Sequence, residues 1–495
     1  MPEYILGLKK YCVPVKFEFE VDFYALGAHV YTTENLLDKL LLDSNDVSIK
    51  DYDDDLDDDD LDDDDLDEDF SPRFLVIEIK SLIDGTYGVN EIARCLRPKL
   101  LIIQGILSFL ANYPFTTYQV SHISSSFYTN SQAINQDEIK ISLFLVKGKD
   151  RSADLYKLLQ SVCSEEIKNK KFLVSLLDRW RKALFLKRKS GSEELLYADE
   201  AFLAYFHTLE LLASHWQREV EKECDYKITN FLIDIFQNTL KSRGSRLEQE
   251  VQNNLKQFRT LLTNGGQISV YSKICYFLSK FGMLDAKSQN LVATLVDTRN
   301  KIAHGQQVYQ EQLTWPLPPF FPLNEEPEYR LLEVEILAAR AIASHVGLDI
   351  WQEEWEDLHH SLEPPIDLIK KFISEKHFQN ISSKQFLLGT DEGICPSSII
   401  DAFLSNKLKF HQLEESLRSV ILDVDLSADE VENLLWAAIV LTDSQDEELS
   451  KRCKDIVEEA YNQASTDVKD IFKYLEYKNI KLTWIEEWIE KKRRT

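Results

Sequence analysis

Hydrophobic and polar residues alternate in the first third of the chain. Between residues 16 and 23, phenylalanine or valine at every second position alternates with lysine, glutamate or aspartate. A period of two buries one face of a β-strand, so this pattern predicts a strand. We expect two further strands at 74–80 and 139–147, with an apolar helix at 100–111 between them. The region therefore predicts a mixed α/β domain.

From about residue 153 onward, hydrophobic residues recur with the helical period of three to four. The lengths and spacing of these segments are typical of a helical bundle: they lie near 197–219, 226–241, 246–263, 268–282 and 286–304, followed by one long helix at 329–358. We therefore expect an α+β fold in four parts: an N-terminal mixed α/β domain (1–150), a basic helical connector (151–194), an all-α helical bundle (195–357) and a C-terminal helical region (365–495).

Two segments interrupt this pattern. Residues 51–69 hold fifteen acidic side chains and no basic one, with a leucine at every fifth position, which fits neither a helix nor a strand. Dense like charge repels, so we expect a disordered acidic loop. The prolines of segment 315–322 exclude a helix there. Because the tract carries more than half of the net charge of −27, the acidic composition does not exclude nucleic acid as a partner.

Composition and motifs exclude several classes of protein. No apolar run has membrane-spanning length, and seven scattered cysteines without a CxxC pair suit a reducing compartment. No Walker glycine loop, HExxH, GxSxG or kinase motif occurs, and the histidines lack metal-ligand spacing. We therefore expect a cytoplasmic protein that contacts no membrane and uses no metal or cofactor.

A basic cluster between residues 168 and 189 stands out in this acidic chain. Lysine and arginine at this density can follow a phosphate backbone, although a solvated helix face has the same composition. The candidate RNA-binding residues are Arg179, Arg181, Lys182, Lys187, Arg188 and Lys189.

Segment 291–305 carries the most specific chemical pattern. Its hydrophobic residues form one helical stripe, and Arg299 falls inside that stripe. Because a guanidinium keeps its proton, Arg299 must meet a carboxylate, a neighbouring subunit or a phosphate. Asn300 and His304 share a helix face, and Gly305 is placed to end the helix. We take Arg299, Asn300 and His304 as candidate catalytic residues.

A second Arg-x4-His copy, Arg340 to His345, shows that the spacing alone is weak evidence. It lies inside the predicted helix 329–358, with no polar residue directly after the arginine and no glycine directly after the histidine. We interpret it as part of an ordinary amphipathic helix, and it serves as an internal control.

The string Arg-Asn-Lys-Ile-Ala-His-Gly at 299–305 resembles the Arg-x4–6-His signature of the HEPN superfamily. Segment 199–213 resembles an early helix of the Apea-like HEPN group, and the likeness extends over 195–357. Membership would imply a HEPN helical bundle that acts as a metal-independent endoribonuclease, with two motifs facing each other across a homodimer or a higher homo-oligomer.

The resemblance also implies roles for single residues. Arg299 and His304 match the catalytic pair of the family, and Asn300 matches its supporting polar position. Glu210 matches a partner that orients Arg299. HEPN toxins silenced by nucleotidyltransferase antitoxins carry a tyrosine two positions after the histidine, where this chain has Gln306, so we do not expect inhibition by that route.

A large α/β part ahead of such a bundle is similar to stand-alone anti-phage HEPN proteins. The resemblance therefore implies an abortive-infection toxin that cuts RNA after a phage-derived trigger, with transfer RNA as the expected substrate. Metal-free cleavage uses the 2′-hydroxyl of the RNA as nucleophile, so the protein must move protons and stabilise charge on phosphorus. An imidazole suits the first task and a guanidinium the second.

Two other interpretations stay open. Glu78 and Lys80 lie on one side of a predicted strand and resemble the Glu-x-Lys part of a restriction-endonuclease core, which would hold Mg²⁺ together with an upstream aspartate. The other interpretation is a HEPN scaffold or sensor without catalysis. Trp351 and Trp355, four residues apart, suit either a docking face or core packing.

Overall fold

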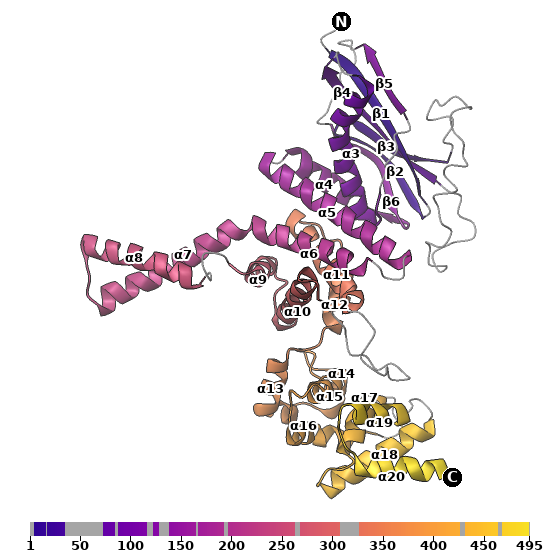
Figure 1. Cartoon of the computed structure of the whole chain (residues 1–495), viewed down its shortest axis with the longest axis vertical. Helices are drawn as coiled ribbons and strands as arrows, with labels where there is room; N and C mark the ends of the chain where they lie inside the picture. The colour runs from indigo at the N-terminus through magenta and orange to yellow at the C-terminus, as the bar shows by residue number, and fades with distance from the viewer. Residues whose placement is uncertain are drawn as a thin grey trace. The chain divides into compact units, whose positions relative to one another are not determined.

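The computed structural model describes residues 4–15, 17–34, 73–84, 88–115, 122–127, 138–164, 167–192, 197–262, 268–306, 326–425, 431–463 and 468–494. The predicted acidic loop and the proline-rich segment 315–322 lie outside these residues. The fold is α+β, as predicted, with one antiparallel sheet near the N-terminus and helices in the rest of the described chain (Figure 1).

The chain divides into two compact units. Unit 1 takes its described residues from Met1–Gly282, Leu295–Gln306 and Pro327–Trp355. Unit 2 takes its described residues from Met283–Thr294, Gln307–Glu326 and Glu356–Thr495. No helix in the described part of the chain is both long and apolar enough to cross a membrane.

The described strands of unit 1 form a seven-stranded sheet in the order β5-β1-β4-β3-β2-β6-β7. Their bounds are β1 Tyr4–Val15, β2 Phe19–Ala25, β3 Ala28–Thr33, β4 Arg73–Asp84, β5 His122–Phe127, β6 Lys140–Val146 and β7 Lys149–Asp150. All pairs are antiparallel. The three predicted strands are confirmed as β2, β4 and β6, whereas the other four were not predicted.

One face of the sheet is covered by helices (Figure 1). The alternation in β2 buries Phe19, Val21 and Phe23 on this face, where α3 (Val89–Ala111) and α4 (Ser152–Ser164) pack. Helix α3 begins eleven residues before the predicted helix at 100–111. The opposite face of β2 carries the polar residues of the same alternation, so this strand separates a packed side from a more exposed side.

Helix α5 (Ile167–Ser192) packs closely on α3, because Gly105 leaves room for it. A β-carbon at Gly105 would lie 3.1 Å from the β-carbon of Leu177. Trp180 of α5 is fully buried, and its ring meets those of Phe109 and Tyr205 at 5.6 and 5.1 Å. This aromatic cluster joins the helix layer on the sheet to the helical bundle.

The bundle helices are α6 (Ala198–His215), α7 (Gln217–Asp234), the π-helix η3 (Ile235–Thr239), α8 (Gly244–Leu262), α9 (Val270–Lys280), α10 (Ala286–Ala303), α11 (Glu326–Val346) and α12 (Gln352–Ser361). The predicted single helix at 329–358 was wrong. The chain breaks it between Gly347 and Trp351, which both have positive φ. Trp351 and Trp355 therefore do not share one helix, and Trp355 is buried.

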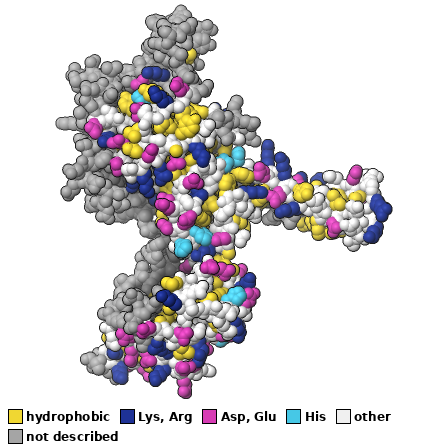
Figure 2. Space-filling view, turned by 180° about the vertical axis from the view of Figure 1, so that it is seen from behind, with side chains coloured by type: hydrophobic (Ala, Val, Ile, Leu, Met, Phe, Trp, Pro, Cys, Tyr) yellow, Lys and Arg dark blue, Asp and Glu magenta, His cyan; other side chains and the backbone are white. Residues whose placement is uncertain are grey.

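Helices α7 and α8 form a hairpin that projects from the rest of unit 1 (Figure 1). Its fully buried core is small and consists of Ile228, Leu232 and Val251. Several large hydrophobic side chains stay exposed along it, as the yellow atoms on this hairpin in Figure 2 show. Arg259 of α8 forms an ion pair with Asp225 of α7, which holds the two helices in register.

Every secondary-structure element in the described residues of unit 2 is a helix, as predicted for 365–495. Its helices are α13 Ile366–Ser374, η4 His377–Asn380, α14 Ser383–Leu388, α15 Pro396–Leu404, α16 Phe410–Asp423, α17 Val431–Leu441, α18 Glu447–Gln463, α19 Val468–Tyr477 and α20 Thr483–Arg494. Helix α17 lies at the centre, and its residues Ala437–Leu441 are all buried in one hydrophobic core. Trp488 of α20 joins this core.

Candidate functional site

Helix α10 ends in a well-defined cap that presents His304. Gly305 has a φ of 70°, and its N–H donates to the carbonyl of Ile302 at 2.8 Å. The next N–H, that of Gln306, donates to the carbonyl of Lys301 at 2.9 Å. These two bonds make a Schellman motif, so the predicted glycine cap is confirmed. His304 is therefore exposed at the last turn of the helix.

Arg299 forms an ion pair with Glu210 of α6. Its Nη2 lies 2.8 Å from Glu210 Oε1, and its Nη1 donates to Asn300 Oδ1 at 3.1 Å. The guanidinium also lies over the Phe206 ring, 6.0 Å from the ring centre. The expectation that Arg299 needs a partner is confirmed, and this partner is a carboxylate. The Arg299 side chain is 30% exposed, so a ligand can still reach it.

A histidine that sequence reasoning did not single out lies beside this ion pair. His207 Nε2 lies 3.9 Å from Glu210 Oε2, one helical turn away on α6. Burial lowers the pKa of His207, and the positive charges of Arg179 and Arg299 add to this, while Glu210 opposes it. The neutral imidazole is therefore favoured at neutral pH. Its spacing of three residues from Glu210 was the only signal in the sequence.

The structure groups the predicted site residues into two sets. Arg299, Asn300 and Glu210 are in mutual contact through Arg299. Within the described part of the chain, no hydrogen bond or ion pair joins the imidazole of His304 to these three. His304 and the Arg299 group are thus neighbours along one helix without a direct contact.

The six candidate RNA-binding residues have different environments on α5. Arg181 is buried, with its guanidinium 2.8 Å from Asp178 and donating to the carbonyl of Phe115. Lys187 lies 2.6 Å from Glu335 of α11, whose side chain is 2% exposed. Burial removes Arg181 from an RNA surface, whereas Lys187 pairs with Glu335 and still has a side chain that is 39% exposed.

Of the other four residues, Arg179 and Lys182 are exposed, whereas Arg188 and Lys189 are partly exposed, as Lys187 is. Lys182 is 62% exposed and lies 2.7 Å from Asp178, while Arg188 lies 4.9 Å from the ring centre of Tyr113. Lys189 is partly buried. Arg179 is the one whose charge acts on His207, and it connects the basic helix electrostatically to the Arg299–Glu210 pair. Of the six candidates, only Arg181 is therefore withdrawn from an RNA surface on α5 by burial.

The control copy, Arg340 and His345, is engaged inside unit 1. Arg340 Nη1 donates to the carbonyls of Leu348 and Ile350 at 3.1 and 3.3 Å, just beyond the end of its own helix. The His345 ring packs edge-on against Phe172 at 5.4 Å. Both side chains therefore stabilise the end of α11.

The rival metal site finds little support in the described residues. Glu78 is 15% exposed and lies 2.7 Å from Lys80, so the two satisfy each other. Among the described residues, no group of three or more histidine, cysteine, aspartate or glutamate side chains is arranged to hold a metal ion. The aspartates of 51–69 that this interpretation needs lie outside the described residues.

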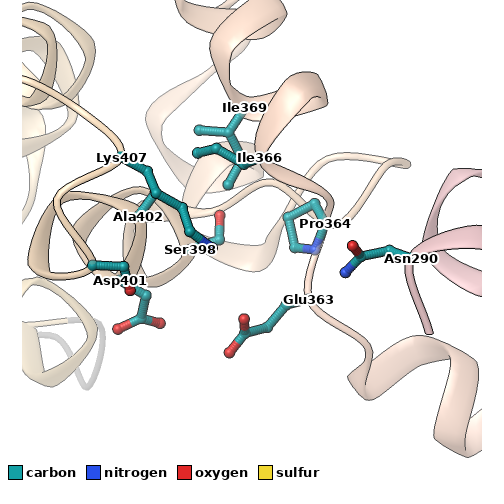
Figure 3. Close-up of a pocket in the computed structure, with 10 residues that line it drawn as sticks. Asn290, Glu363, Pro364, Ile366, Ile369, Ser398, Asp401, Ala402 and Lys407 are labelled. Carbon is teal, nitrogen blue, oxygen red and sulfur yellow. The ribbon is translucent and has the colours of Figure 1, made fainter. Parts of the chain in front are cut away.

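Unit 2 contains a small pocket of about 110 Å³ that contains none of the candidate residues. Asp401 and Glu363 turn their carboxylates toward the same end of it (Figure 3). Burial and the negative charge of Glu363 raise the pKa of Asp401 to about 6. Two adjacent carboxylates repel, so Asp401 takes up a proton at a higher pH than an ordinary aspartate does.

Comparisons of the chain with protein-family models, with curated proteins and with solved structures found no match. The arrangement around Arg299 must therefore be judged by its own chemistry. A guanidinium that is 30% exposed and held by a carboxylate can bind a phosphate, and the histidines on the same two helices, His207 and His304, can exchange protons with it.

Proposed function

We propose that this protein is a metal-independent endoribonuclease of the HEPN type. The single observation that carries the proposal is the Arg299–Glu210 ion pair, in which one residue from each HEPN-like segment meets the other at 2.8 Å. By the sequence resemblance, segments 199–213 and 299–305 belong to one catalytic site. Residues of one site must lie close together, and the contact between Glu210 and Arg299 meets that condition. In the second Arg-x4-His copy, Arg340 donates to the backbone carbonyls of Leu348 and Ile350.

In the proposed reaction the 2′-hydroxyl of the RNA attacks the adjacent phosphorus, and the 5′-oxygen of the next nucleotide leaves. The products are a 2′,3′-cyclic phosphate and a 5′-hydroxyl. One group takes the proton of the 2′-hydroxyl and another gives a proton to the leaving oxygen. No metal ion is needed when two such groups and a cation are in place.

Arg299 stabilises the negative charge that develops on the phosphate oxygens. Glu210 and Asn300 hold its guanidinium in one orientation, which reduces the freedom that binding must otherwise remove. His304 transfers a proton from its exposed position at the end of α10. An in-line displacement needs a second proton-transfer group on the opposite side, and we propose that His304 of a second copy of the chain supplies it.

We further propose a role in defence against phage, with unit 1 containing both the nuclease and, in its N-terminal sheet, the part that senses infection. The support for this role is the resemblance to stand-alone anti-phage HEPN proteins. Transfer RNA is the substrate that the resemblance favours, and the trigger would come from the phage.

The test is cleavage of total RNA in EDTA by the wild type and by His304→Ala and Arg340→Ala. Wild type and Arg340→Ala should cleave, and His304→Ala should lose activity by about 100-fold or more. Equal loss in both variants, or cleavage that EDTA abolishes, contradicts the proposal. Mass spectrometry of the product ends should find the 2′,3′-cyclic phosphate.

A further inference from the structure

The face of the sheet opposite the helices carries an acidic and aromatic surface. Alternation in β2 and β3 brings its residues to one side, and strand pairing places Tyr24 opposite His29, His29 opposite Glu78, and Asp22 opposite Tyr31. We call this surface the acidic–aromatic face and define it by Glu20, Asp22, Tyr24, His29, Tyr31 and Glu78. It belongs to unit 1 and is remote in sequence from the proposed nuclease residues.

The acidic–aromatic face is hollowed. All of its defining residues except Tyr24 line a wide depression of about 770 Å³, which Glu34 and Arg73 also line. Four carboxylates line this depression against one guanidinium, so its charge is clearly negative. A concave surface of this sign repels phosphate and attracts cations.

The four carboxylates differ in the ion pairs that they form with other residues of the chain. Glu20 and Glu34 both hold Arg73, and Glu78 lies 2.7 Å from Lys80. Asp22 lies 2.9 Å from Nε2 of His29. Within the described residues, no lysine or arginine pairs with Asp22, whose side chain is 45% exposed. Asp22 is therefore the carboxylate best placed to receive an outside cation.

Aromatic rings lie beside this carboxylate. The rings of Tyr24 and His29 are stacked, with centres 4.0 Å apart and planes 10° apart, and the centre of the Tyr31 ring lies 4.5 Å from that of His29. Tyr24 is 46% exposed. A flat π-surface next to a carboxylate suits a planar cation, which can stack on the ring while it donates hydrogen bonds to the carboxylate.

We propose that the acidic–aromatic face binds an arginine-containing peptide segment of a partner protein. Guanidinium is favoured over ammonium because it is planar, less strongly hydrated, and able to donate two parallel hydrogen bonds to Asp22. Nucleic acid is disfavoured because its phosphates would meet four carboxylates. The proposal is independent of the ribonuclease activity and gives the N-terminal sheet a recognition surface of its own.

The test measures binding of a fluorescent, acetylated and amidated Gly-Arg-Gly-Arg-Gly peptide to the full chain by anisotropy. The same sequence with lysine in place of arginine is the second probe. Residues 51–69 would attract any cation through their charge, so a variant with all of their carboxylates converted to amides is measured in parallel. Binding of the arginine peptide should persist in that variant.

Two paired variants locate the binding. Asp22→Asn with Tyr24→Ala removes the proposed contacts, and we expect about a tenfold loss of affinity. Asp154→Asn with Tyr156→Ala on α4 is the matched control: it changes the same residue types at the same spacing and removes the same charge, and Tyr156 is 49% exposed. The control should change affinity by less than about twofold.

Asp22→Asn alone, which changes charge without removing a ring, should still lower affinity by roughly threefold, and thermal melting checks that each variant is folded. Equal losses in the two double variants, or loss of binding when 51–69 is neutralised, would overturn the proposal. So would equal affinity for the lysine peptide, which means recognition of charge alone. Binding of an RNA oligonucleotide that depends on Asp22 and Tyr24 would identify a different class of partner and also overturn it.

Discussion

The two Arg-x4-His copies of this chain have the same spacing and different environments. His304 directly follows α10 and His345 lies in the last turn of α11, and a left-handed glycine, Gly305 or Gly347, follows each helix end. Arg299 meets a carboxylate on another helix and stays 30% exposed. Arg340 donates instead to backbone carbonyls just past its own helix. The two copies therefore differ in the partner that each guanidinium meets, and not in the spacing of arginine and histidine. Arg299 belongs to a candidate site, whereas Arg340 stabilises the end of its own helix.

The difference has a physical origin in the neighbouring helices. Glu210 reaches Arg299 because α6 presents it beside Phe206, over which the guanidinium lies. Around the second copy the neighbours are rings: His345 meets Phe172, His215 and Trp216. An aromatic surrounding excludes water and favours packing, whereas a carboxylate at the surface leaves a charged pair within reach of a ligand.

The comparison predicts reciprocal effects when each arginine is removed. Arg299→Ala should lower RNA cleavage by roughly 10²–10³-fold, because it deletes the group that stabilises charge on the phosphate. Its effect on stability should stay below about 1 kcal/mol, because the ion pair is partly exposed to water. Arg340→Ala should lower the free energy of unfolding by about 1–3 kcal/mol, because two carbonyls lose a charged donor. Cleavage assays and urea unfolding measure the two quantities.

Arg299→Lys refines the test without removing the charge. Lysine lacks the fork of donors that matches Glu210 and a phosphate, so most of the cleavage loss should remain. The expected difference between Arg299 and Arg340 would be contradicted if Arg299→Ala lost much stability while each folded molecule still cleaved RNA fully. That result would place Arg299 with Arg340 as a structural residue.

A second prediction compares two carboxylates that each hold a cation. Glu210→Gln keeps the shape of the side chain and removes its charge, so Arg299 should be less well oriented. We expect cleavage to fall by roughly tenfold, which corresponds to about 1.4 kcal/mol. Steady-state assays should assign the loss mainly to kcat, because Glu210 acts through Arg299.

The matched variant is Glu335→Gln. Glu335 is 2% exposed, pairs with Lys187, and accepts a hydrogen bond from Tyr205. Breaking a buried pair should lower the free energy of unfolding by about 3 kcal/mol and leave cleavage per folded molecule unchanged. Should Glu210→Gln destabilise the chain as strongly as Glu335→Gln while cleaving normally, its orienting role is wrong.

The sequence predicted correctly those elements of the fold that depend on the residue types at a few neighbouring positions. The alternation in β2 and the cap at Gly305 are of this kind, and both are confirmed. Strand β1 was missed because Gly7, two adjacent lysines and Pro14 interrupt its alternation, and the serine-rich β5 has little hydrophobic signal. Both strands form by pairing with distant segments, which a single sequence does not display.

The sequence likewise predicted some features of the candidate site, whereas others became apparent only from the fold. The position of Arg299 in an apolar stripe predicts that it needs a partner. The family resemblance pointed to Glu210 as that partner, and the fold shows the contact between the two side chains. The burial of Arg181 and the pairing of Lys187 with Glu335 depend on which helices surround α5, so the basic run alone overestimated the RNA surface. His207 was overlooked because a single histidine on an amphipathic helix carries no signal until Glu210 and Arg299 are placed beside it.

The smallest predicted effect concerns His207 and the pH dependence of stability. Burial, helped by Arg179 and Arg299, lowers its pKa below the usual 6.5, so the folded state holds the neutral form. The unfolded state therefore takes up a proton first as the pH falls below about 6.5. The wild type should lose stability over that range relative to His207→Gln. Because the His207 side chain is 42% exposed, the difference should be under about 1 kcal/mol, or roughly 1–2 °C in melting temperature.

Melting curves between pH 8 and pH 5 test this, with His360→Gln as a control for an exposed histidine in α12. A protonated His207 would also repel Arg299 and attract Glu210, since it lies next to both charges. Cleavage by the wild type should therefore decline more steeply toward pH 5 than cleavage by His207→Gln. If cleavage by the wild type and by His207→Gln declines equally toward pH 5, His207 does not act on the Arg299–Glu210 ion pair. The difference between the two Arg-x4-His copies then depends on Glu210 alone.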